Sequence, residues 1–168
     1  MGDTHEAVRC QRNAIRDANG FYAAPVLHLT RLLLRSDPPL EVREYLGRII
    51  GTSRRAAALR ALAQVLLAEG HPEHSLAVLT EARELSPGDS AISITMADAL
   101  IRLGDLDGAR EQIASVPPGS ATHSLALAKR VLIGIISRDA GEARAAAEQL
   151  RPVAGGLYAA AYEAAVAM

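Results

Sequence analysis

Aromatic residues are scarce in this sequence. They make up 3% of its 168 residues, with one Phe, four Tyr and no Trp. The apolar content, 49% of the chain, comes instead from Ala, Leu, Val and Ile, and Ala alone holds 33 positions. Ala and Leu favour helix, whereas strands are enriched in aromatic and β-branched residues. The composition therefore excludes an all-β sandwich or barrel and predicts an all-α protein.

Three further shortages narrow the class of protein. The formal net charge is −1 and basic residues form no long run, so we expect no nucleic-acid partner. No apolar run is long enough to span a bilayer, so we expect no membrane insertion. Cys10 is the sole cysteine, which excludes an intramolecular disulfide, and the polar N-terminus does not resemble a secretory leader. These features predict a cytoplasmic protein.

What the sequence does contain is a repeat of 34 residues. Three units of this period lie at 56–89, 90–123 and 124–156, and each holds two amphipathic stretches. In the first unit, the apolar spacing predicts a helix that ends at Gly70 and a second helix that ends before Pro87. Gly104 follows Gly70 by 34 residues, and Arg138 follows at the same interval. Each unit is therefore predicted to be a helical hairpin.

The segments outside these units also show helical spacing. We expect an N-terminal helix at 1–20, a degenerate hairpin at 22–55 and a C-terminal helix at 157–168, all within a single domain, 1–168. The C-terminal helix is nearly uncharged apart from Glu163, whereas the end of a repeat array normally presents a polar face. We therefore expect it to pack on a second copy of the chain, on a partner or on a continuation of a longer chain.

The small residues of the repeat resemble those of the tetratricopeptide repeat family. In that family, small residues lie where paired helices approach closely, with a glycine at the turn and often a proline after the second helix. Here the small positions hold Ala63, Ser75, Ala82, Ala97 and Ala109, while the third unit departs with Val131 and Leu150. The resemblance is strongest over 56–123. It implies a right-handed α-solenoid of helix-turn-helix repeats, about four hairpins plus terminal helices.

The resemblance also implies a function. Members of the family bind a partner peptide or helix in a concave groove lined by the first helix of each hairpin, so we expect a non-enzymatic scaffold or adaptor for protein–protein interaction. The residues expected to line this groove are Arg60, Gln64, Ile94, Asp98, Ile101, Arg102, Leu125, Lys129 and Leu132, with Ile135 and Ile136 beside them.

Charge and apolarity in this lining point to different ligands. Some members of the family grip a terminal carboxylate, and Arg60, Gln64 and Lys129 occupy three of the positions that do so. Leu125 replaces a lysine of that pattern and Asp98 adds a repelling carboxylate, which argues against such a clamp. The apolar lining favours a hydrophobic partner helix or a self-contact. Alternatively, these apolar residues belong to the hydrophobic core, if the third unit is rotated relative to the register assumed here.

Residues with catalytic or metal-binding chemistry form no recognised pattern. The stretch His71-Pro72-Glu73-His74 brings two histidines close in sequence, but it lies at a turn where Pro72 opens the next helix, which favours a structural role. The sequence has no glycine-rich phosphate loop and no nucleophile elbow. We therefore expect no enzyme activity, no metal and no cofactor.

Two alternative functions remain open. One is a repeat segment of a larger enzyme, such as a transferase, that presents substrate to the catalytic part. The other is a chaperone or co-chaperone module, because the stretch 82–117 is similar to the helical part of bacterial thioredoxin-fold holdase chaperones. The thioredoxin domain and its Cys pair are absent from this sequence.

Overall fold

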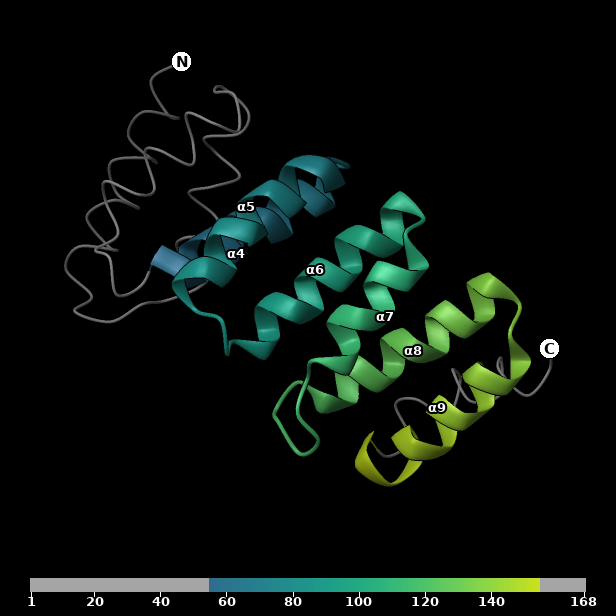
Figure 1. Ribbon diagram of the computed structural model, residues 1–168. Helices are drawn as coiled ribbons and strands as arrows, with labels where there is room; N and C mark the ends of the chain where they lie inside the picture. The colour runs from purple at the N-terminus through teal and green to yellow at the C-terminus, as the bar shows by residue number, and fades with distance from the viewer. Residues whose placement is uncertain (1–54, 155–168) are drawn as a thin grey trace, which may run out of the picture. The chain divides into compact units, whose positions relative to one another are not determined.

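The computed structural model of the protein describes residues 55–154, and every regular element among them is a helix (Figure 1). The chain divides into two compact units, Met1–Gly88 and Asp89–Met168. In the first unit the described helices are α4 (Arg55–Ala68) and α5 (Pro72–Leu85). In the second they are α6 (Ser90–Leu103), α7 (Leu106–Ala114), α8 (His123–Ser137) and α9 (Ala140–Ala154). The all-α class is confirmed.

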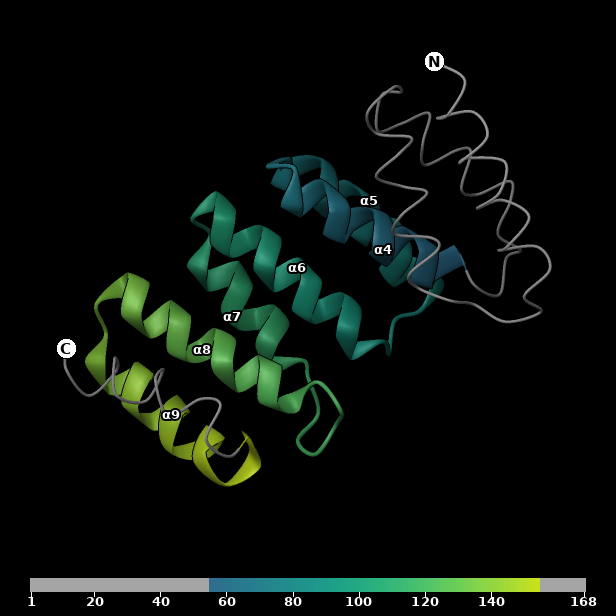
Figure 2. The ribbon, with the colours of Figure 1, turned by 180° about the vertical axis from the view of Figure 1, so that it is seen from behind.

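The helices pair as the 34-residue period predicts. Figures 1 and 2 show α4 beside α5 and α8 beside α9 from opposite sides, and α6 likewise packs on α7. The predicted helices at 1–20 and 157–168 lie outside the described residues, and the predicted hairpin at 22–55 ends where those residues begin. The single domain over 1–168 stays a prediction.

The turn inside each hairpin has the same backbone geometry. Gly70 and Gly104 are both in the left-handed region, with φ of 84° and 82°. At the first turn, the N–H of Gly70 donates to the carbonyl of Leu67 at 3.1 Å, and the N–H of His71 donates to that of Leu66 at 2.8 Å. The same two bonds, shifted by one repeat, close the turn at Gly104. This pairing satisfies carbonyls that the helix end would otherwise leave unbonded.

The third turn keeps this geometry although its residue is not a glycine. Arg138 has φ of 59°, and among the described residues it is the one non-glycine residue with positive φ. Its N–H donates to the carbonyl of Ile135 at 3.2 Å, and the N–H of Asp139 donates to that of Gly134 at 2.9 Å. Because a side chain in this region costs about 1–2 kcal/mol, the packing of the hairpin must hold the turn in place.

Aspartates begin the second helix in the two later hairpins. Asp105 accepts a hydrogen bond from the N–H of Gly108 before α7, and Asp139 accepts one from the N–H of Glu142 before α9, each at 2.9 Å. Such a cap is worth about 1 kcal/mol. In α5 the same end is opened by Pro72 at the start of the helix, the structural role predicted for this turn.

Small residues bring α4 and α5 together in the first unit. Ala63, Ser75 and Ala82 are completely buried. The hydroxyl of Ser75 donates to the carbonyl of Ala63 at 3.0 Å, so the buried oxygen is satisfied and the two helices are held at close range. Leu66 on α4 and Leu79 on α5 are also completely buried. The hairpin is therefore stabilised by an aliphatic core.

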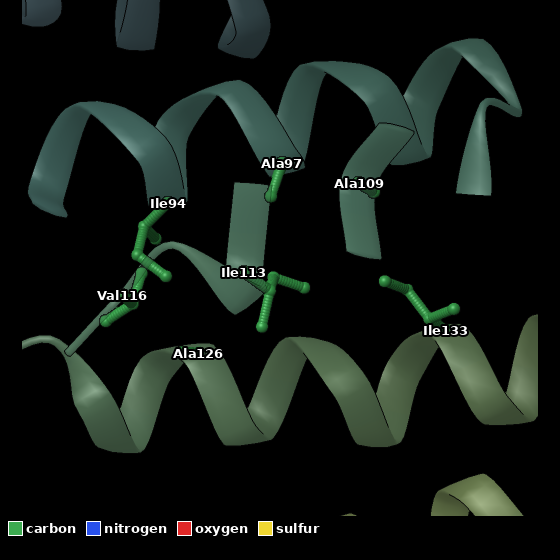
Figure 3. Close-up of a cluster of buried hydrophobic side chains, with 7 residues drawn as sticks. All are labelled: Ile94, Ala97, Ala109, Ile113, Val116, Ala126 and Ile133. Atoms are coloured by element: carbon green, nitrogen blue, oxygen red, sulfur yellow. The ribbon is translucent and has the colours of Figure 1, made fainter. Parts of the chain in front are cut away.

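In the second unit, α6, α7 and α8 share one core. Its members are Ile94 and Ala97 from α6, Ala109 and Ile113 from α7, Val116 after α7, and Ala126 and Ile133 from α8. Figure 3 shows Ile113 and Val116 lying between the ribbons of α6 and α8. Burying a side chain of this size stabilises the fold by about 1.5–3 kcal/mol.

The third hairpin places its close contact at a different residue. Where the earlier hairpins have Ala63 and Ala97, it has Val131, which packs against Ala143 and is almost completely buried. The smallest residue instead is Gly134: a Cβ added there would lie 2.6 Å from the backbone nitrogen of Ala143 and 2.9 Å from its Cα. A larger residue in one turn of α8 is therefore compensated by a smaller one in the next.

Replacing Gly134 tests this backbone contact. We expect Gly134→Ala to lower the free energy of unfolding by about 1–2 kcal/mol, because the new methyl group would push α9 away from α8. Without that contact, Ala would stabilise a helix interior by about 1 kcal/mol relative to Gly. The measurement is urea unfolding of the full chain followed by circular dichroism.

Gly141→Ala is the matched control for this experiment. Gly141 is also helical but exposed, and a Cβ there would meet the Asp139 side chain at 3.2 Å. Because that contact is with the Asp139 oxygen that caps α9, the control should change the free energy of unfolding by less than about 1 kcal/mol in either direction. A Gly134→Ala protein as stable as the wild type would show that α8 and α9 do not touch at this point.

Replacing Arg138 tests the cost of the third turn. Arg138→Gly should raise the free energy of unfolding by about 0.5–1 kcal/mol, since glycine adopts positive φ without steric cost. The reciprocal change, Gly104→Arg, should lower it by about 1 kcal/mol through the backbone alone, because no atom lies within 4 Å of an added Cβ there. Urea unfolding compares both with the wild type. A loss of stability in Arg138→Gly would contradict the backbone explanation.

Candidate partner-binding face

One stripe of side chains runs along α8. Leu125, Lys129, Leu132 and Ile136 follow the spacing i, i+4, i+7 and i+11, which places them on one side of a helix. The three apolar members are unusually open to solvent for large aliphatic residues, with exposures of 43% for Leu125, 39% for Leu132 and 49% for Ile136. Single exposed apolar residues are ordinary on protein surfaces, but three on one side of one helix make that side a candidate binding surface.

An ion pair joins this stripe to α6. The ammonium group of Lys129 contacts the carboxylate of Asp98, and the two side chains are 24% and 32% exposed. Asp98 was expected to repel an acidic ligand, and its pairing with Lys129 adds a second reason against a carboxylate clamp, because the lysine already has an anion. The pair also ties the first helices of two successive hairpins together within the second unit.

Arg102 lies one turn after Asp98 on α6. It is exposed and forms no ion pair within the described residues. Its guanidinium therefore remains available to a ligand. We call Asp98, Arg102, Leu125, Lys129, Leu132 and Ile136 the α6/α8 face.

The structure corrects one member of the predicted groove. Ile94 is 6% exposed and belongs to the core that α6 shares with α7 and α8 (Figure 3). Ile101 and Ile135 are partly buried and pack against the two core clusters of the second unit. Ile94 is therefore a core residue, whereas Leu125 and Leu132 are exposed, and their role in binding stays a prediction.

Arg60 and Gln64 lie on α4, in the other compact unit. Gln64 is exposed, and Arg60 is partly buried with an Nε that has no hydrogen-bond partner. Their role in binding stays a prediction. The remaining seven of the nine predicted groove residues lie in the second unit. Five of these seven belong to the α6/α8 face.

Another ion pair joins α7 to α9, the second helices of two successive hairpins. Arg110 of α7 donates to Glu142 of α9 at 2.8 Å and to Asp107 at 2.7 Å. The hydrogen bond to Glu142 is the main cause that raises the pKa of Arg110 above its usual range. The sequence shows no local signal for this link, because its partners are 32 residues apart. It fixes α7 relative to α9 inside the second unit.

The histidine pair offers no metal site in the described part of the chain. The rings of His71 and His74 meet edge to face with centroids 5.9 Å apart, and both residues are exposed. Within 55–154 there is no group of three His, Cys, Asp or Glu side chains that could hold a metal ion. No described helix is long and apolar enough to cross a membrane.

Comparison with known proteins agrees with this architecture. The tetratricopeptide repeat family model matches residues 66–130. Among solved structures, PilF of Pseudomonas aeruginosa has 17% identity and a TM-score of 0.60, covering 94% of this chain and 71% of its own. YrrB, described as a TPR protein with an unusual peptide-binding site, has 17% identity and a TM-score of 0.60, covering 99% and 83%.

A third solved structure, MamA, has 15% identity and a TM-score of 0.57, covering 99% of this chain and 88% of its own. A search of the curated proteins found no match. At these identities the solved structures show a shared fold. The match of residues 66–130 to the tetratricopeptide repeat family model agrees with the 34-residue period and the paired helices, and the chain shares the fold of these tetratricopeptide repeat proteins.

Proposed function

We propose that the chain is a non-enzymatic adaptor that binds an amphipathic segment of a partner protein on the α6/α8 face. The observation that carries the proposal is the exposed stripe of Leu125, Leu132 and Ile136. Covering such side chains with a partner helix removes apolar surface from water, and a helix offers matching side chains at the same three-and-four spacing. The family supports this function, because its repeats form protein-interaction modules.

The charges of the face define the partner further. Lys129 is neutralised by Asp98, so the free cation is Arg102. A carboxylate on the partner would meet that guanidinium in the two-pronged geometry that arginine favours. We therefore propose a partner segment with an apolar stripe and an acidic residue placed opposite Arg102.

The remaining expectations stay predictions. The C-terminal helix that was expected to join a second copy lies outside the described residues, and the cytoplasmic location and the absence of a nucleic-acid partner are likewise untested. No feature of residues 55–154 favours the alternatives of a transferase segment or a chaperone module over an adaptor.

A charge placed in the stripe tests the proposed function. A peptide selected against the full chain from a random display library supplies the probe, and its Kd is measured by isothermal titration. We expect Leu132→Asp to weaken binding at least tenfold, about 1.4 kcal/mol, since the carboxylate would be buried against apolar side chains. Because Leu132 is a surface residue, helical content and Tm should change little.

Leu85→Asp is the matched control. Leu85 is the same residue type, is 50% exposed and lies on α5, outside the α6/α8 face. Peptide affinity should be unchanged in this variant. Equal losses in the two variants would overturn the assignment of the face, and a collapse of Tm in Leu132→Asp would show that Leu132 is a core residue.

A further inference from the structure

The second helix of the middle hairpin is unusually short. α7 has 9 residues, whereas α5 has 14 and α9 has 15. The cause is local: Pro117 and Pro118 follow closely, and a proline can neither donate to the helical ladder nor fit inside it. The chain therefore leaves the helix early and crosses to α8 as an irregular connection.

A cavity of about 410 Å³ lies beside this shortened helix, bounded by α7, the connection, α8 and α9. All of its lining residues belong to the second unit. Ile113, Val116 and Leu127 give it a buried apolar floor. Ala114 and Gln149, which also line it, are exposed, so a peptide chain can enter and leave across them.

The lining also carries one arginine that is not engaged by a carboxylate. It contains two arginines and one glutamate, and Arg110 is already paired with Glu142 and with Asp107. Arg130 forms no hydrogen bond or ion pair within the described residues. The Nδ1 atom of His123 is buried and has no hydrogen-bond partner. This atom has almost no accessible surface, so a ligand in the cavity does not reach it, and Arg130 is the group that can meet an anion.

The polar and apolar lining residues of α8 are spaced to contact a ligand that has both a charged and an apolar side chain. His123, Leu127 and Arg130 are at i, i+4 and i+7, so two nitrogen-bearing side chains flank an apolar one on the same side of the helix.

We propose that this cavity is a second binding site, which takes an acidic side chain of a partner segment together with an adjacent apolar side chain. The carboxylate meets Arg130, and the apolar neighbour lies on the floor formed by Ile113, Val116 and Leu127. The site lies on the side of the second helices and shares no residue with the α6/α8 face. It therefore does not depend on the function proposed above.

A matched pair of small probes tests the charge requirement on the full chain. Acetyl-Leu-Glu-amide carries the acidic side chain, and acetyl-Leu-Gln-amide has nearly the same shape without the charge. In nuclear magnetic resonance titrations, the first should shift the amide signals of Leu127 and Arg130 with a Kd on the order of 1 mM, and the second should bind about tenfold more weakly. Equal affinities would overturn the proposal.

Variants of the chain locate the site. Arg130→Gln should remove the difference between the two probes, and Ala114→Phe, at an exposed position of the rim, should block both. Arg102→Gln and Leu132→Asp, on the α6/α8 face, should leave both affinities unchanged, which separates this result from a failure of the adaptor function. A preference for the acidic probe that survives in Arg130→Gln would contradict the assignment.

A third probe separates two sources of the carboxylate. Acetyl-leucine with a free terminal acid should bind no more tightly than acetyl-Leu-Gln-amide, because the site is proposed to take the carboxylate of a side chain next to the leucine. If acetyl-leucine binds and acetyl-Leu-Glu-amide does not, the cavity recognises a chain terminus and the proposal for an internal acidic residue is wrong.

Discussion

The close approach of the two helices in each hairpin is the constraint on which the rest of the structure depends. Ala63 and Ser75 meet in the first hairpin, and Gly134 and Ala143 meet in the third with almost no space between backbones. Such contacts admit only small side chains, and alanine supplies them without weakening the helix. The abundance of Ala and the shortage of aromatic residues are thus two consequences of one geometry.

Features that depend on a single local signal could be predicted from the sequence. The helix ends at Gly70 and Gly104 need a residue that tolerates positive φ, and the 34-residue period by itself assigns Arg138 to the same role. The compensation between Val131 and Gly134 is different in kind. It depends on how the volumes of two helices add up across their contact, which spacing along one helix does not reveal.

The α6/α8 face, too, could be predicted from the sequence only in part. The periodicity of the sequence predicted which residues of the first helices are apolar and share a side. It could not say which of these residues face the core and which face water. On α6, Ile94 is among the buried residues, because it packs in the core that α6 shares with α7 and α8. On α8 the neighbours cover Ile133 and leave Leu132 open. The pairing of Asp98 with Lys129 likewise required the distance between helices from different repeats.

Pro117 ends the second helix of the middle hairpin early, and the proposed binding cavity lies beside this shortened helix. A second helix of full length would fill the space next to α8, whereas the short α7 leaves Arg130 and His123 beside a cavity. Because this cavity and the α6/α8 face belong to the same compact unit, a partner segment long enough to reach both would bind them as one ligand. Linking two weak contacts in this way raises affinity by about 100-fold or more without any new contact, provided that the linker spans both sites. On the function proposed for the α6/α8 face, a weak site for one acidic side chain would decide which of several amphipathic segments that face retains.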